Sequence, residues 1–327
     1  MKAQRGVALI TVLLVVAVVT VVCAGMIARQ QLSIRATANG QQARQALHYA
    51  LGGEALAQSI LRRDLKLSGS GTALPAVDHL LEPWALPQPA YDLDEGQGQV
   101  QIRIEDLAGR FNLNSLVQDQ QPNKAAIAQF RRLLLRLQIS QPYAERLVDW
   151  LDTDQQPTGE FGAEDSAYQL LDPPYRTAGR RLEDLSELRL LLDMRDEDFQ
   201  RLAPYVTALP ADTPLNVNTA SAMVLSSLAD NLSPSAAEAL VQARQKSGFR
   251  DLAAFMAQPA LGGVQPKGSA LAVTSEFFQV TSEVRLADRR LALVSRLRRE
   301  DSGDVRVLQR NLGQPPRLLR QTDDKER

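Results

Sequence analysis

The sequence predicts an α+β fold in which a long N-terminal helix packs on a small antiparallel sheet and a large all-α domain is inserted into that sheet. An uncharged apolar run opens the chain, and a helical pattern of apolar residues continues after it. Alternating apolar residues, typical of half-buried strands, occur once near residue 100 and again only after about residue 276. The long stretch between them has helical periodicity, so a helical domain interrupts the sheet.

The N-terminal run extends from Val7 to Ala28 without a charged residue. About 20 apolar residues in a helix span the hydrocarbon core of a bilayer. Lys2 and Arg5 precede the run, so the positive-inside rule places the start in the cytoplasm and the bulk of the chain in the periplasm. We therefore expect a single-pass inner-membrane protein. One alternative is a secretory signal cut near Cys23, and another is a buried core helix, which the lack of a polar face disfavours.

The boundary Arg5-Gly6-Val7 gives this helix a more specific interpretation. A short basic leader that ends in Gly before a long apolar helix resembles a type IV prepilin processing site. The resemblance implies that a prepilin peptidase cleaves between Gly6 and Val7. Most such proteins have Glu at the fifth mature position, where this chain has Thr11. An ionised carboxylate in a bilayer costs roughly 2.5 kcal/mol or more unless it is paired. A subunit at the tip of a filament has no earlier neighbour to pair with, so Thr11 favours a tip subunit.

The rest of the chain divides by pattern. A helical pattern from Arg29 to about Leu67 predicts that the membrane helix continues as a stalk, and a Gly-, Ser- and Pro-rich loop follows. The alternating residues near 100 predict the first of four strands, and those after 276 predict a meander of the other three. The predicted organisation is a leader (1–6), a transmembrane helix (7–28), the stalk and first strand (29–105), the inserted domain (106–275), the remaining strands (276–313) and a disordered tail (314–327).

The inserted domain repeats itself weakly, because Asn112-Leu113-Asn114-Ser115 is matched by Asn216-Val217-Asn218-Thr219. We expect two related helical bundles, the second similar to a helix-hairpin-helix module. A DNA-binding hairpin needs glycines whose backbone N–H groups hold phosphate, whereas the stretch that begins at Asp230 contains none. The net charge is only -1 and no extended basic face is visible. No nucleic-acid partner is predicted, and the module is expected to be a packing scaffold.

An acidic segment between residues 149 and 165 contains no Lys, Arg or His. A hard cation with oxygen ligands would relieve the repulsion between its carboxylates, and Pro157, Gly159 and Gly162 allow the chain to fold back on itself. The spacing is not that of an EF-hand. A solvated acidic loop without an ion is an equally weighted alternative. The candidate calcium ligands are Asp149, Asp152, Asp154, Glu164 and Asp165.

The sequence predicts no enzyme. No recognisable nucleophile or substrate-binding motif accompanies the acidic segment, so hydrolysis by paired carboxylates is disfavoured. The single cysteine, Cys23, lies in the apolar run, and His48 and His79 stand alone. Neither redox chemistry nor a histidine-based site is indicated.

Several of these features together resemble a known family. The Gly6 leader, Thr11, the acidic segment, Pro173-Pro174-Tyr175 and the run LNVNTA from residue 215 are similar to the general secretion pathway K family. Members of that family are the largest minor pseudopilins of type II secretion systems. The resemblance covers nearly the whole chain. It implies a pseudopilin fold with an inserted helical domain, and calcium bound in that domain.

The resemblance also implies partners and a role. The partners would be minor pseudopilins I and J in a tip complex, minor pseudopilin H, major pseudopilin G and the prepilin peptidase. The role would be to initiate and limit assembly of the pseudopilus while folded exoproteins are exported across the outer membrane. Three other interpretations remain: a membrane-anchored calcium-binding periplasmic protein, a calcium-dependent periplasmic hydrolase, and a DNA-uptake protein with a helix-hairpin-helix module.

Overall fold

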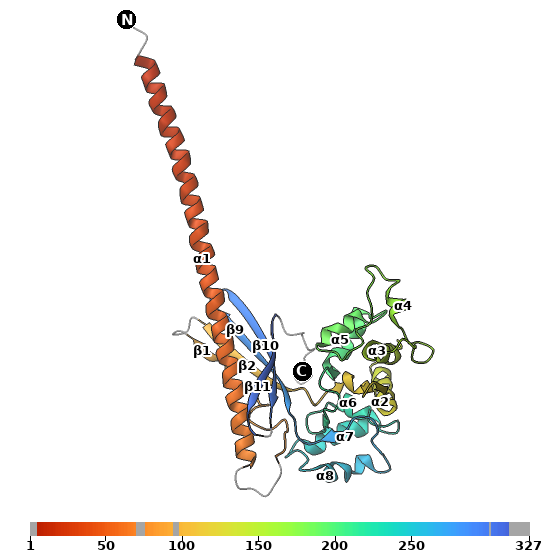
Figure 1. The fold of residues 1–327 in the computed structure, drawn as a ribbon. Helices are drawn as coiled ribbons and strands as arrows, with labels where there is room; N and C mark the ends of the chain where they lie inside the picture. The colour runs from red at the N-terminus through yellow and green to blue at the C-terminus, as the bar shows by residue number, and fades with distance from the viewer. Residues whose placement is uncertain (1–4, 70–75, 94–97, 301, 314–327) are drawn as a thin grey trace, which may run out of the picture.

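The computed structural model describes residues 5–69, 76–93, 98–300 and 302–313, and Figure 1 shows the arrangement of the elements. The helices are α1 Arg5–Gly69, α2 Lys124–Arg136, α3 Tyr143–Leu151, α4 Asp165–Tyr168, α5 Asp196–Leu202, α6 Ala222–Ser226, α7 Pro234–Arg244 and α8 Leu252–Met256. The strands are β1 Tyr91–Leu93, β2 Gly98–Asp106, β3 Phe111–Asn112, β4 Val117–Gln118, β5 Gln121–Pro122, β6 Val206–Thr207, β7 Leu215–Asn216, β8 Leu271–Ala272, β9 Phe277–Leu286, β10 Arg289–Arg299 and β11 Val305–Leu312. Short 3-10 turns are η2 Leu113–Leu116, η3 Leu185–Leu190, η4 Ala203–Tyr205 and η5 Pro259–Leu261.

Helix α1 is a single uninterrupted helix of 65 residues, so the prediction that the membrane segment continues as a stalk is confirmed. Its first half projects away from the rest of the molecule, and its large apolar side chains from Leu9 to Ile34 are more than half exposed. Its second half buries a stripe of small and apolar residues, Ala46, Ala50, Ala57 and Leu61, at helical spacing. This stripe packs on the main sheet.

The main sheet is antiparallel and has the order β1-β2-β9-β10-β11. Four of its strands were predicted, and the fifth, β1, was missed because three residues are too few to show an alternation. In β2, Val100, Ile102 and Ile104 are buried and the residues between them face outward, as a sheet with one covered face requires. The predicted fold class, a long helix on a small antiparallel sheet with an inserted domain, is confirmed.

Gly53 allows α1 to lie close to the sheet. A Cβ atom at this position would collide with the Ser282 Oγ atom and would lie 3.2 Å from Val100 Cγ1. Gly52 has no atom within 4 Å of the equivalent position, and Gly40 meets only the end of the Arg44 side chain at 3.8 Å. Among the stalk glycines Gly40, Gly52 and Gly53, Gly53 makes the close contact with the sheet.

The inserted segment leaves the sheet at the end of β2 and returns at the start of β9. It forms two apolar cores, one around Phe111, Phe130 and Leu147 and the other around Leu225 and Phe255. Six strands of two residues each, β3 to β8, lie among its helices. They are too short to appear as an alternating pattern in the sequence. Across the sheet face opposite α1, Arg296 of β10 donates to the carbonyl oxygens of two residues of the insert, at 3.0 and 3.2 Å.

The two matched Asn motifs have matching contacts. Asn114 exchanges two hydrogen bonds with the backbone of Leu182, at 2.8 and 3.0 Å. Asn218 exchanges two with the backbone of Phe249, at 2.6 and 2.9 Å. Each buried amide thus fixes a loop from further along the chain. The predicted leader falls largely, and the predicted disordered tail (314–327) wholly, outside the described residues.

Candidate metal centre

The acidic segment forms a loop between α3 and α4. Asp152 ends α3, where its N–H donates to the Val148 carbonyl at 3.0 Å, and Glu164 is the N-cap residue of α4. Asp152, Asp154 and Glu164 each offer a carboxylate oxygen within 4.8 Å of those of the other two. Three of the five predicted ligands therefore come together in one group.

Three oxygens of this group have no hydrogen-bond partner among the described residues. The Asp152 Oδ1 atom and both carboxylate oxygens of Glu164 are buried and accept no hydrogen bond from the described residues. Among the described residues, the acidic segment forms one ion pair, between Arg176 and Asp165. That ion pair does not involve Asp152, Asp154 or Glu164. Buried acceptors without donors cost free energy, so this arrangement favours a bound cation.

The electrostatics of the group also favour a bound cation. Burial, and then the neighbouring carboxylates, raise the pKa of Glu164 to about 7. The same two causes raise the pKa of Asp152 to about 6. Without an ion, part of the group would bind protons near neutral pH in order to relieve the repulsion.

The other two predicted ligands have different surroundings. Asp149 lies in the last turn of α3 and accepts from the Thr158 N–H at 2.9 Å. Gly162 lies so close that a Cβ atom there would collide with the Asp149 carboxylate. Asp165 accepts from the N–H and the hydroxyl of Thr177, both at 2.9 Å. These two carboxylates hold the loop in shape, and neither belongs to the group of three.

The three carboxylates fit a hard divalent cation. Calcium prefers oxygen ligands in a flexible arrangement, and water can complete a coordination sphere that begins with three carboxylates. Zinc is disfavoured because no Cys or His belongs to the group. The loop can thus hold calcium through Asp152, Asp154 and Glu164.

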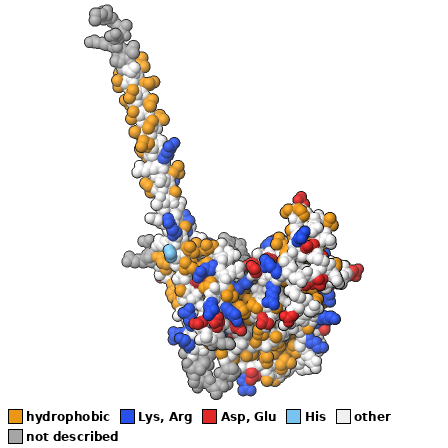
Figure 2. Space-filling model, in the orientation of Figure 1, with side chains coloured by type: hydrophobic (Ala, Val, Ile, Leu, Met, Phe, Trp, Pro, Cys, Tyr) orange, Lys and Arg blue, Asp and Glu red, His pale blue; other side chains and the backbone are white. Residues whose placement is uncertain are grey.

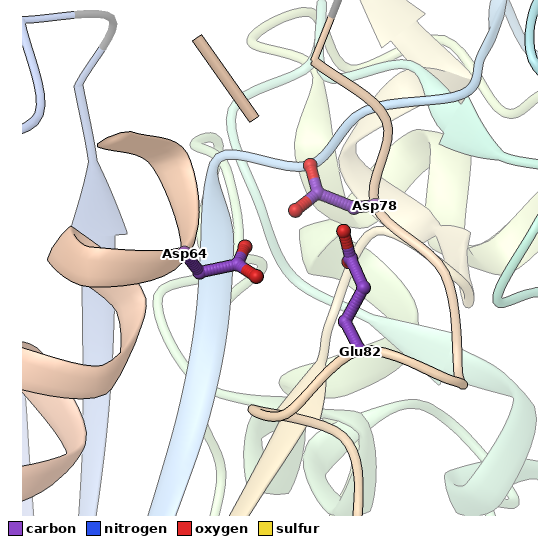
Figure 3. Close-up of side chains that lie close together, drawn as sticks. All are labelled: Asp64, Asp78 and Glu82. Atoms are coloured by element: carbon purple, nitrogen blue, oxygen red, sulfur yellow. The ribbon is translucent and has the colours of Figure 1, made fainter. Parts of the chain in front are cut away.

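A second acidic group was not predicted. It consists of Asp64, near the end of α1, and of Asp78 and Glu82, from the segment before β1. Their carboxylate oxygens lie within 4.8 Å of one another, and Figure 3 shows the three side chains converging. Here a cation is already present, because the Arg299 guanidinium lies 3.2 Å from Asp64 and 2.5 Å from Asp78. No local pattern marks the group, because the Arg299 that joins Asp64 to Asp78 lies 235 and 221 residues further along the chain.

The N-terminal half of α1 is long and apolar enough to cross a membrane. An 18-residue window has a mean hydropathy of 2.9 and is 0% buried within the structure. Figure 2 shows hydrophobic side chains over the projecting part of the helix. By length and composition a signal sequence would pass the same test, so the helix supports a single-pass anchor without placing the protein in a particular membrane.

Comparison with known proteins assigns the family. Two family models, both described as type II secretion system protein K, match residues 109–211 and 215–274. A curated type II secretion system protein K from Pseudomonas aeruginosa is 51% identical over 96% of this chain and 94% of its own length. The chain belongs to the type II secretion system protein K family. A second protein K, from Klebsiella pneumoniae, is 36% identical over 95% of this chain and 97% of its own.

The K family assignment agrees with the fold. A crystal structure described as the GspK-GspI-GspJ complex from enterotoxigenic Escherichia coli contains a chain that is 30% identical, with a TM-score of 0.74. The match covers 85% of this chain and 99% of that one. The chain is therefore a minor pseudopilin, a structural subunit and not an enzyme, and this confirms the resemblance found in the sequence.

Proposed function

We propose that this K-family chain is the tip subunit of a type II secretion pseudopilus, where it initiates and limits assembly during export of folded exoproteins. The tip assignment rests on Thr11, which stands where most such proteins have Glu. In a later subunit that Glu carboxylate would pair with an earlier neighbour, whereas a tip subunit has no earlier neighbour and no such pairing. The exposed apolar half of α1 supplies a surface that a membrane and then the helices of other subunits can cover.

The proposed partners follow from the relative of known structure. That relative is a K chain in a complex with I and J chains, and the present chain is similar to it over nearly all of the relative's length. We assign minor pseudopilins I and J as direct partners in the tip complex. Minor pseudopilin H and major pseudopilin G would follow in the filament, and the inner membrane would hold α1 before assembly.

Cleavage by prepilin peptidase is the first test of this function. The protein recovered from inner membranes is expected to begin at Val7 and to retain the whole apolar helix when the peptidase is present, and to begin at Met1 when it is absent. Intact mass and N-terminal sequencing distinguish the two. Gly6→Val should block the cut, whereas Gly40→Ala in the stalk should leave it unchanged. A start beyond Cys23 would indicate an ordinary secretory signal and would contradict the pseudopilin function.

Calcium binding is the second part of the proposal. Asp152, Asp154 and Glu164 would hold the ion, and Asp149 and Asp165 would position the loop around it through Thr158 and Thr177. The buried, partnerless oxygens of Asp152 and Glu164 support this assignment. A bound divalent cation would join the end of α3 to the start of α4, and this would stabilise the first core of the inserted domain.

The calcium affinity is expected to fall in mild acid. Protons compete for Glu164 below about pH 7 and for Asp152 below about pH 6, the values to which burial and repulsion raise their pKa. The dissociation constant should therefore rise roughly tenfold or more between about pH 8 and about pH 6. Calorimetric titration of the full-length protein in detergent measures this. Equal affinities at the two pH values would mean that neither carboxylate binds the ion.

A further inference from the structure

Four buried carboxylates meet where the stalk, the sheet and the inserted domain join. Asp64 ends the packed part of α1, and Asp78 and Glu82 lie in the segment before β1 (Figure 3). Asp106 ends β2. Each is at most 9% exposed. None of them belongs to the acidic loop of the proposed calcium site. We call this set the carboxylate junction.

One guanidinium enters the junction. Arg299, at the end of β10, contacts Asp64 at 3.2 Å and Asp78 at 2.5 Å, and it also donates to the Ser275 carbonyl at 3.1 Å. Its side chain is 4% exposed and lies over the Phe278 ring at 4.8 Å. Asp78 in turn accepts from the Ser275 N–H at 2.7 Å. The ion pairs of the junction are therefore shared by two carboxylates and one cation.

Asp106 connects the junction to the inserted domain. Its carboxylate accepts from the hydroxyls of Ser275 and Thr219, at 2.6 and 2.5 Å, and from the Asn216 side-chain amide at 3.2 Å. Asn216 and Thr219 belong to the second half of the insert, whereas Ser275 immediately precedes the return to the sheet. Among the described ion pairs, none involves Asp106, so only neutral donors hold it.

Glu82 also has no cationic partner among the residues that the structure describes. It accepts from the Trp84 indole N–H at 2.7 Å and from the His79 N–H at 2.9 Å, and the described ion pairs do not include it. His79 packs against Gly248 in the turn between α7 and α8, where a Cβ atom would lie 2.9 Å from the imidazole ring. The segment that carries Glu82 is thus pressed onto the inserted domain.

The charges of the junction do not balance. Four carboxylates share one guanidinium, so full ionisation would leave three buried negative charges without a counterion. Burial raises the pKa of Glu82 to about 7 and the pKa values of Asp64 and Asp106 to about 6. In each case burial is the largest cause. Proton binding near neutral pH is the available relief.

We propose that the carboxylate junction is a proton-sensitive lock that holds the inserted domain against the stalk and sheet while Glu82 is neutral and loosens when Glu82 ionises. The groups that face Glu82 are Asp64, Asp78 and His79, and ionised Glu82 would be repelled by both aspartates. Separation of the inserted domain from the stalk and sheet would hydrate these charges, and it would break the contacts between the two parts.

The sign follows from the raised pKa values. A carboxylate whose pKa is higher in the closed state than in water stabilises that state most at low pH, and this contribution is lost as the pH rises through the raised value. Burial lowers the pKa of His79, whose Nδ1 atom accepts from the Leu81 N–H at 3.2 Å. Protonation of His79 would remove that acceptor and act in the opposite direction, so the test stays at or above about pH 6.

Hydrogen exchange tests the lock in the full-length protein in detergent. The measured quantity is the protection factor, the intrinsic exchange rate of an amide divided by its observed rate. For the amides of His79 and Ser275 it should be roughly tenfold lower at about pH 8.5 than at about pH 6. Glu82→Gln keeps an acceptor oxygen for both donors but cannot ionise. Protection of the two amides in this variant should therefore stay near the low-pH level at the higher pH.

Glu283→Gln is the matched control, because Glu283 is a surface carboxylate of β9 paired with Arg103. This variant should keep the pH dependence of the parent. Spin labels can be attached at Ser59→Cys and Leu135→Cys in a Cys23→Ala background. The distribution of distances between the two labels should broaden at the higher pH in the parent and not in Glu82→Gln. An unchanged protection in the parent, or a pH dependence retained in Glu82→Gln, would overturn the proposal.

Discussion

Adding calcium to the chelated full-length protein is expected to raise the melting temperature of the inserted domain by roughly 5–10 °C at saturation. An ion that binds only the folded state at about 100 times its dissociation constant contributes about 2.7 kcal/mol. For a domain of roughly 150 to 250 residues, each kcal/mol corresponds to about 2–4 °C. Differential scanning calorimetry in detergent, with and without a chelator, measures the shift.

Glu164→Gln should abolish that shift and change the ion-free protein in the opposite direction. The side chain of Glu164 is 3% exposed, and its oxygens have no partner among the described residues. Replacing the charge by a neutral amide removes the repulsion with Asp152 and Asp154, so the chelated variant should melt higher than the chelated parent. Loss of the calcium response together with this gain would separate a lost ligand from a damaged fold.

Glu160→Gln is the control for this experiment. Glu160 is an exposed carboxylate of the same loop and lies outside the group of three. The same chemical change there should leave the calcium-dependent shift intact. A parent whose melting temperature is the same with chelator and with millimolar calcium would exclude the calcium site, and the loop would then be a solvated acidic segment.

The fold was largely predictable because its main signals are local. The apolar run and the helical spacing that follows it specify α1, and the alternation of Val100, Ile102 and Ile104 specifies β2. The strands after residue 276 show the same alternation, so the interruption of the sheet was visible in the sequence. Two-residue strands such as β3 and β7 depend on tertiary contacts and have no period to detect.

The candidate metal site was predictable only in part. The crowding of carboxylates in one loop is a local feature, and the structure brings three of them, Asp152, Asp154 and Glu164, into one group. Which members would turn away was not predictable, because Asp165 is engaged by Thr177 from the next loop. The carboxylate junction was missed for a related reason: Arg299 lies 235 residues from Asp64 and 221 from Asp78, and no spacing rule connects residues so far apart.

Gly53→Leu is expected to destabilise the pseudopilin domain by about 3 kcal/mol or more, whereas Gly52→Leu should leave it stable. Inserting side-chain atoms into a closely packed contact costs about 1–3 kcal/mol and occasionally more, and here both Ser282 and Val100 block the position. A Cβ atom at Gly52, one residue earlier, would meet no atom of the described residues within 4 Å. Replacing a helical glycine where there is space removes a penalty of about 1 kcal/mol.

The pair of variants distinguishes close packing from a general need for flexibility in the stalk. Urea denaturation in detergent measures stability, and copurification with the I and J pseudopilins measures assembly. If α1 must lie at this distance from β9 and β2, only Gly53→Leu should lose both, because the displaced helix would also separate Glu54 from Arg310, which it pairs with at 2.7 Å. Equal losses in the two variants would mean that hinge motion of the stalk, and not its contact with the sheet, is what the glycines provide.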